Sequence, residues 1–294
     1  MRGKEKFSGF GVIGGSKAFL SINGDWGNCI SSRKIKTPFG ISSPLHIYEK
    51  DEIRFAFISR HGEKGYEIAA PFINYRANIF AMKSIGVKRI ISWSGPGIIN
   101  DKKLKVGELY LPDDVLDETK HRKDTFFERG GIGFVRQNPV FCNELYDFIK
   151  KTLRSMKIRF KSGGIYVCTE GPRLETVAEI KKYKVLGGDV VGMTIAPECF
   201  LARELEICYH SICYLTNLAE GIGEKKSFKP GVLFEGMQDE KEAKKVSEIQ
   251  QVLPEIIFNV IKSFAENIRT CVCPDYMLRY KKRGVLDSEW RKWF

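Results

Sequence analysis

Short apolar, β-prone runs alternate along this chain with segments of helical periodicity, and this alternation constrains the fold more than any other feature. It predicts an α/β architecture in which helices cover the faces of a central sheet. The expected strands are residues 10–13, 54–59, 89–93, 165–168, 190–193 and 212–216. The expected helices are residues 75–84, 175–184, 197–206 and a long amphipathic segment from about 239 to 268, which Pro254 should kink or split.

The chain is long and apolar enough for one substantial core. It has 294 residues, of which 43% are hydrophobic, and no internal repeat or linker divides it. We therefore predict a single domain, a central mixed β-sheet flanked by helices, over residues 1–268, followed by a C-terminal extension at 269–294. The apolar runs are too short for a membrane helix and the first residues do not fit a secretory signal, so the expected location is the cytoplasm.

The chain is basic, with 48 Lys and Arg against 36 Asp and Glu, a formal net charge of +12. Such a balance suits nucleic acid, a membrane surface or an anionic small substrate. The basic residues are scattered, and the densest group lies in the tail beyond Tyr276. A solvated face is the expectation for that tail, and a nucleic-acid partner is not expected.

The cysteines are numerous for a chain without an obvious export signal. Eight are present: Cys29, Cys142, Cys168, Cys199, Cys208, Cys213, Cys271 and Cys273. No Cys-x-x-Cys pair occurs and the histidines lie far from the single Cys-x-Cys, so the spacing does not predict a zinc site. Most should be small buried hydrophobes, and the Cys-x-Cys at 271–273, expected in an exposed segment, is the best candidate for disulfide chemistry.

Small or polar residues follow five of the expected strands. They are Gly14-Gly15-Ser16, Arg60-His61, Ser94-Gly95, Met193-Thr194 and Asn217. Ligands of α/β proteins bind beyond the carboxyl ends of strands, and these residue types suit an anion: glycine backbone N–H groups, hydroxyl donors and a guanidinium fork. Each segment alone is also an ordinary turn, so the set of five carries the prediction.

Several longer stretches resemble one family in the right order and spacing. They are VIGGS (12–16), ISRHG (58–62), INYRANIFAMKSIGVKRII (73–91), TEGPRLETVAEI (169–180), GGDVVGMTIAPECFLARELEICY (187–209) and LTN (215–217). The chain resembles the trimeric purine nucleoside phosphorylases, most closely their methylthioadenosine phosphorylase branch, over roughly residues 8–265. The resemblance implies a homotrimer, or a dimer of trimers, that cleaves a purine nucleoside with phosphate to give free base and (deoxy)ribose 1-phosphate.

The resemblance also assigns roles to individual residues. It implies a catalytic and base-binding role for Glu175 and Asn217, with Ala219 beside them, and places Met193 under the ribose. Phosphate, a co-substrate, would be bound by Ser16, Arg60, His61, Ser94, Thr194 and the backbone N–H of Gly95. No metal or organic cofactor is implied.

Hydrogen-bond polarity favours a 6-oxopurine base such as that of inosine or guanosine. An ionised Glu175 only accepts, so it suits the N1–H of hypoxanthine or guanine and repels the N1 lone pair of adenine. The methylthioadenosine branch has an Asp in place of Asn217 and a second Asp where this chain has Ala219. Leu174 stands where 6-oxopurine enzymes often have a Phe, and this difference counts against a 6-oxopurine base.

Other interpretations remain open. The 5′ group of the substrate is hydroxyl or methylthio, so S-methyl-5′-thioadenosine or S-methyl-5′-thioinosine phosphorylase is the alternative enzyme. A catalytically silent paralogue that binds a nucleoside or RNA is the non-enzyme alternative, and a nucleoside hydrolase is a third. The resemblance also brings Cys142 and Cys208 near each other, and the hypothesis pairs the Cys-x-Cys with another cysteine such as Cys199 or Cys213.

Overall fold

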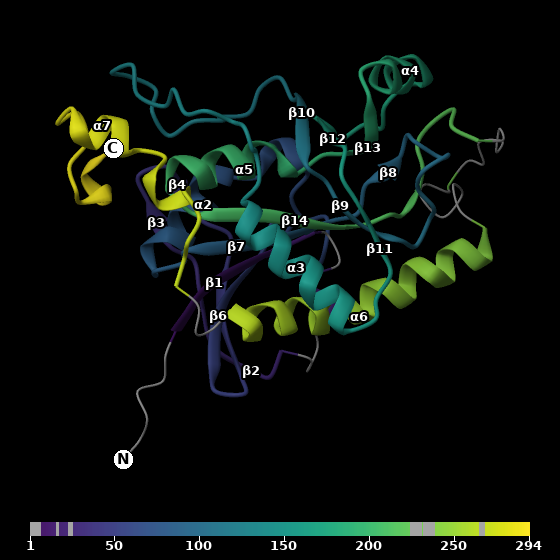
Figure 1. Cartoon of the computed structure of the whole chain (residues 1–294), viewed down its shortest axis with the longest axis horizontal. Helices are drawn as coiled ribbons and strands as arrows, with labels where there is room; N and C mark the ends of the chain where they lie inside the picture. The colour runs from purple at the N-terminus through teal and green to yellow at the C-terminus, as the bar shows by residue number, and fades with distance from the viewer. Residues whose placement is uncertain (1–6, 16–17, 23–25, 224–230, 232–238, 265–267) are drawn as a thin grey trace.

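The computed structural model describes residues 7–15, 18–22, 26–223, 231, 239–264 and 268–294. A mixed sheet of eight strands runs through the middle of the molecule, in the order β11-β9-β14-β7-β1-β6-β5-β2 (Figure 1). Its strands are β1 (Phe7–Gly14), β2 (Asn28–Arg33), β5 (Leu45–Lys50), β6 (Ile53–Ser59), β7 (Arg89–Ser94), β9 (Leu109–Leu111), β11 (Phe160–Ser162) and β14 (Cys208–Tyr214). The predicted α/β class with a central mixed sheet is confirmed.

The four central strands, β6, β1, β7 and β14, are parallel to one another. Gly14 pairs with Ser59, and Cys213 pairs with Ser94, so these strands end together. Their carboxyl ends therefore meet at one edge of the sheet, which is where ligands of α/β proteins bind.

A second sheet of five strands, in the order β10-β12-β13-β8-β15, continues from that edge. Its strands are β8 (Gly97–Ile98), β10 (Asp114–Glu118), β12 (Ile165–Thr169), β13 (Gly188–Gly192) and β15 (Asn217–Leu218). β8 follows β7 and β15 follows β14 in the chain. The edge at which the central strands end therefore lies between the two sheets. A two-stranded ribbon, β3 (Lys36–Thr37) with β4 (Gly40–Ile41), completes the pairing.

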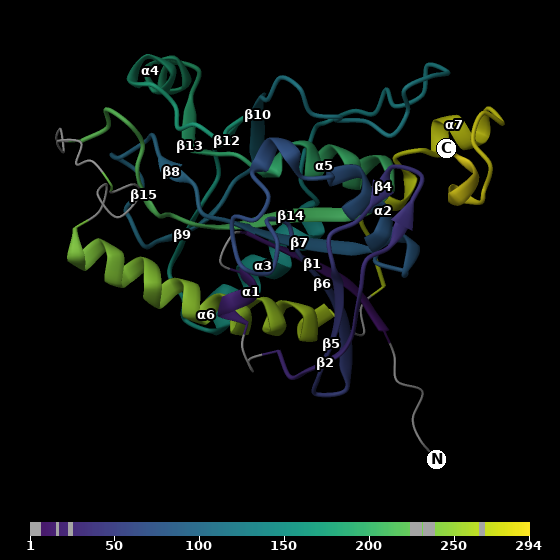
Figure 2. The ribbon, with the colours of Figure 1, turned by 180° about the vertical axis from the view of Figure 1, so that it is seen from behind.

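Helices cover both faces of the larger sheet (Figures 1 and 2). α2 (Tyr75–Ser84) and α5 (Ile195–Glu204) pack together on one face, and α3 (Asn143–Ser155) and α6 (Glu240–Phe264) pack together on the other. The short α1 (Ala18–Ser21) touches α6, and α4 (Val177–Val185) packs on β13. α2 begins where predicted because the side chain of Asn74 accepts a hydrogen bond from the N–H of Ala77.

Pro254 was expected to kink or split the long helix, and the split does not occur, since α6 is one helix from Glu240 to Phe264. The Pro254 carbonyl accepts a hydrogen bond of 2.8 Å from the buried indole of Trp26. Buried residues on both sides of the proline, among them Leu253 and Ile257, hold the helix against the sheet. None of the helices in the described part of the chain is long and apolar enough to cross a membrane.

The C-terminal residues pack against the same core as the rest of the chain. They form short turns of helix at Cys273–Asp275, α7 (Leu278–Lys282) and Trp290–Lys292. Buried side chains from this segment join the main cluster: Cys273, Met277, Tyr280, Leu286 and Trp293. The Cys-x-Cys was expected in an exposed segment. Val272 between the two cysteines is 64% exposed, but Cys271 is half-buried and Cys273 is only 3% exposed.

Candidate active site

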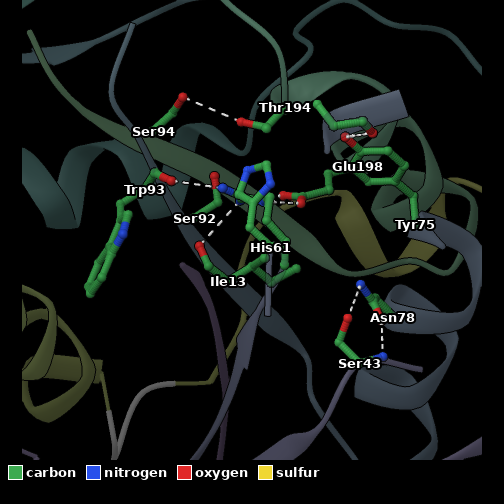
Figure 3. A network of polar contacts seen from close by, with 12 residues as sticks. Ile13, Ser43, His61, Tyr75, Asn78, Ser92, Trp93, Ser94, Thr194 and Glu198 are labelled. Carbon is green, nitrogen blue, oxygen red and sulfur yellow. Dashed lines mark hydrogen bonds and ion pairs between the residues drawn. The ribbon is translucent and has the colours of Figure 1, made fainter. Parts of the chain in front are cut away.

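A buried ion pair lies at the carboxyl ends of the central strands. Arg60, the first residue after β6, is 0% exposed, and its Nε and Nη2 donate to the two carboxylate oxygens of Glu198 at 2.6 and 2.9 Å. Its Nη1 donates to the Trp93 carbonyl at 3.0 Å, and Nη2 also donates to the Ile13 carbonyl at 3.3 Å. Figure 3 shows these two carbonyls and the Glu198 carboxylate converging on one point. The pair thus ties β1, β6 and β7 to α5.

The charge of Arg60 is maintained despite its complete burial. Burial alone disfavours the cation, but the facing Glu198 carboxylate outweighs it and raises the pKa of Arg60. A guanidinium has five N–H groups, of which these contacts engage four. The Tyr209 hydroxyl donates a further hydrogen bond of 2.9 Å to Glu198 Oε2.

His61 follows Arg60 and is neutral at physiological pH. Burial, and then the charge of Arg60, lowers its pKa to about 4. Its Nδ1 lies 2.8 Å from the Ile68 carbonyl, which can only accept, so Nδ1 carries the proton. Nε2 is then a hydrogen-bond acceptor, suited to an O–H group such as that of a partly protonated oxyanion.

Two hydroxyls meet beside the ion pair. Ser94 Oγ, at the end of β7, lies 3.4 Å from Thr194 Oγ1 and 3.0 Å from the Tyr166 hydroxyl, and Figure 3 shows Ser94 and Thr194 facing each other. Gly95 comes next, and a Cβ there would lie 2.8 Å from the ring of Tyr214, so only glycine fits without a shift. The structure therefore brings Arg60, His61, Ser94, Gly95 and Thr194 to the same edge. Ser16 lies outside the described residues.

The residues expected at the base and ribose lie along the second sheet. Glu175 Oε1 accepts a hydrogen bond of 2.5 Å from Thr169 Oγ1 at the end of β12. Met193 follows β13 and packs against Gly171, where a Cβ would lie 2.4 Å from the Met193 sulfur.

Asn217 begins β15, opposite Gly97 of β8. Its Oδ1 accepts from the Thr216 hydroxyl at 2.6 Å, and its Nδ2 donates to the Leu218 carbonyl at 2.9 Å. Ala219 is buried, and its backbone N–H donates to the Ile98 carbonyl. Its methyl side chain offers no hydrogen bond.

Arg122, which the sequence did not single out, braces this part of the site. Its Nη1 donates to the carbonyls of Met193 and Ala196 at 2.6 and 2.7 Å, and its Nη2 donates to those of Thr169 and Glu170 at 3.1 and 2.6 Å. One guanidinium therefore holds the ends of β12 and β13 together. Because Thr169 binds Glu175 and Met193 precedes Thr194, the brace acts on both ends of the site.

The sequence analysis missed three residues that contact the candidate site residues, and their sequence signals differ. Glu198 lies between Pro197 and Cys199 in the predicted helix 197–206, and a lone carboxylate between apolar residues is a signal for a buried partner. Arg122 lies in a charged loop whose sequence shows nothing unusual. Tyr166 reads as an ordinary strand residue. The ring of Trp93 packs at a tilt against those of Trp26 and Phe57, with centroids 5.8 and 6.5 Å apart, so it belongs to the core.

Comparisons with known proteins agree on one family. A family model described as the phosphorylase superfamily matches residues 32–257. The probable S-methyl-5′-thioinosine phosphorylase of Methanopyrus kandleri is 43% identical over 194 residues, 66% of this chain and 75% of that protein. The probable 6-oxopurine nucleoside phosphorylase of Dictyoglomus turgidum is 38% identical over 262 residues, 86% of this chain and 91% of that protein.

A solved structure gives the same picture at the level of the fold. A methylthioadenosine phosphorylase from an Antarctic soil metagenomic library aligns with a TM-score of 0.77 at 27% identity, covering 92% of this chain and 91% of that one.

The buried, neutral His61 should make stability depend on acid. Its folded pKa of about 4 lies below the unfolded value of about 6.5, so its contribution to stability is present above pH 6.5 and is lost as pH falls toward 4. His61→Asn, whose amide can still donate to Ile68, should remove this dependence. Denaturant unfolding at pH 7 and pH 5 should show a loss smaller by about 2 kcal/mol in the variant than in the wild type. An unchanged loss would contradict a neutral His61, and His121→Asn, at an exposed position, is the control.

Proposed function

The chain belongs to the phosphorylase superfamily, and from this premise we propose that it is a purine nucleoside phosphorylase that acts on 6-oxopurine nucleosides. The resemblance to the nucleoside phosphorylases stated from the motifs is confirmed by the family match and by the relatives. The enzyme is a pentosyltransferase: phosphate attacks C1′, the bond from C1′ to N9 breaks, and its electron pair leaves with the base. The observation that carries the proposal is the meeting of Arg60, His61, Ser94 and Thr194 at one sheet edge, with Glu175 in the adjoining sheet.

The phosphate end of the site uses donors that are fixed before any ligand arrives. Ser94 and Thr194 offer hydroxyls, Gly95 offers a backbone N–H, and Arg60 offers positive charge. Since Glu198 and two carbonyls already fix the guanidinium, binding phosphate costs little reorganisation. His61 Nε2 can accept from a phosphate O–H. The bound anion is both the nucleophile and the counter-charge to the sugar cation that develops as the bond breaks.

The departing base needs stabilisation of the charge that develops on it. Donation of a hydrogen bond from the Asn217 amide nitrogen to N7 would stabilise the purine as it leaves. Thr169 orients the Glu175 carboxylate, whose two oxygens allow it to accept from a base N1–H as well. A site built for this polarity leaves buried groups unpaired when adenine binds, and therefore rejects it.

The 5′ group of the substrate separates two candidates that share the 6-oxopurine base. Relatives at similar identity bear the names 6-oxopurine nucleoside phosphorylase and S-methyl-5′-thioinosine phosphorylase, so 5′-methylthioinosine is the second candidate substrate. We further propose a homotrimer in the cytoplasm that uses inorganic phosphate as co-substrate and no metal or organic cofactor for this reaction.

Base release distinguishes these substrates directly. Inosine, guanosine, 5′-methylthioinosine, adenosine and 5′-methylthioadenosine are each incubated with the enzyme, with and without phosphate. We expect phosphate-dependent release from the 6-oxopurine nucleosides, at kcat/KM values at least about 100-fold above those of their 6-aminopurine counterparts. Release chiefly from 5′-methylthioadenosine would overturn the polarity argument, and release without phosphate would indicate a hydrolase.

Glu175→Gln tests the base contact separately from the phosphate contact. The amide is no longer an anionic acceptor for N1–H, so kcat/KM for inosine should fall by about 100-fold or more, with KM for phosphate changed little. Glu128→Gln, at an exposed carboxylate paired with Arg76, is the matched control and should behave as wild type. Wild-type kcat/KM in Glu175→Gln would remove Glu175 from the site.

A further inference from the structure

Four of the eight cysteines converge at a place remote from the proposed active site. The sulfur atoms of Cys142, Cys208, Cys271 and Cys273 all lie within 4.8 Å of one another, and those of Cys208 and Cys271 are 3.3 Å apart. Cys142, Cys208 and Cys273 are buried and Cys271 is half-buried. Cys208 is the first residue of β14, so the cluster lies at the amino end of a strand whose carboxyl end leads to Asn217.

We propose that these four cysteines form a tetrathiolate site for Zn²⁺ that fastens the C-terminal segment to the core. Zinc prefers four sulfur ligands in a tetrahedron with bonds of ~2.3 Å, which places the sulfurs ~3.8 Å apart. The observed separations, from 3.3 Å to no more than 4.8 Å, bracket that value. A disulfide needs ~2.05 Å between sulfurs, and all four thiols are free in the structure.

Neighbouring groups can stabilise the negative charge of metal-bound sulfur. Cys142 caps α3, and its sulfur accepts a hydrogen bond of 3.5 Å from the N–H of Leu145, at the end of the helix where the dipole stabilises negative charge. Arg89 pairs with Cys208 in the register of β7 and β14, which places a cation beside the cluster. The buried Tyr276 hydroxyl, which has no hydrogen-bond partner in the described part of the chain, lies next to Cys273 and can donate to a metal-bound sulfur.

Two carboxylates hold the chain on either side of the Cys-x-Cys. Glu144, two residues after Cys142, accepts from the backbone N–H and the hydroxyl of Thr270 at 2.8 and 2.6 Å. Glu206, two residues before Cys208, accepts from the N–H of Met277 and pairs with Lys281 at 2.6 Å. These hydrogen bonds hold the Cys-x-Cys segment beside Cys142 and Cys208 without a metal, and a bound metal would stabilise it there.

Metal binding here needs no redox partner. Each thiol gives up its proton as its sulfur binds Zn²⁺, and no electrons are transferred. The rival arrangement, two disulfides, removes four hydrogens and needs an oxidant. The predicted approach of Cys142 to Cys208 is confirmed, whereas the pairing of the Cys-x-Cys with Cys199 or Cys213 was wrong, because neither belongs to the cluster.

Metal analysis of the full-length chain tests the proposal. The chain is purified with a thiol reductant and without chelator, and its zinc is measured by plasma mass spectrometry. About one zinc per chain is expected. Exchange for Co²⁺ should give the charge-transfer and d–d absorption bands of tetrahedral thiolate cobalt. Cys273→Ser should bind zinc at least about tenfold more weakly, while Cys29→Ser, at an exposed cysteine outside the cluster, should bind as wild type.

Measurements on the wild-type protein alone can overturn the proposal, so the test does not depend on whether a variant folds. No zinc after dialysis against Zn²⁺, with all eight thiols open to titration, would show four unconnected thiols. A denatured, unreduced chain lighter by the four hydrogens of two disulfides would show an oxidised cluster. Removal of zinc should lower the thermal midpoint and its return should restore it, and an unchanged midpoint would contradict the fastening role.

Discussion

The buried ion pair between Arg60 and Glu198 is the interaction on which the rest of the site depends. A guanidinium without exposure to water is tolerable only with a facing carboxylate and acceptors for its N–H groups. Glu198 and the carbonyls of Ile13 and Trp93 supply them. Those partners come from α5, β1 and β7, so a single side chain fixes the relative positions of the elements that carry the proposed phosphate donors. The partners that the fold supplies therefore offset the free-energy cost of burying the guanidinium charge.

A second guanidinium, that of Arg122, fixes the strands at the base end of the proposed site. Arg122 binds backbone carbonyls at the ends of β12 and β13, the strands that lead to Glu175 and Met193. The two arginines act on different sheets, and Thr194, between Met193 and α5, lies where their effects meet. Phosphate and base would then be held by rigid elements rather than by flexible loops, as catalysis by orientation requires.

Much of this arrangement could be predicted because it follows local rules. Asn74 marks the start of α2, and the ends of the parallel strands put Arg60 and Ser94 at one edge without knowledge of any contact. The second sheet could not be predicted, since β8 and β15 have two residues each, too few for a periodic pattern. Contacts made only by tertiary folding were also missed: those of Glu198 and Arg122, and the approach of Cys271 and Cys273 to Cys142 and Cys208.

A double-mutant cycle on Arg60→Met and Glu198→Leu, followed by denaturant unfolding, tests the central claim most directly. Each single variant leaves a buried charge without its partner and should lose about 3–5 kcal/mol of unfolding free energy. The double variant removes both charges and should lose less than the sum, with a coupling energy of at least about 2 kcal/mol. Additive losses would contradict the account, because they would mean that the two side chains stabilise the sheet edge independently.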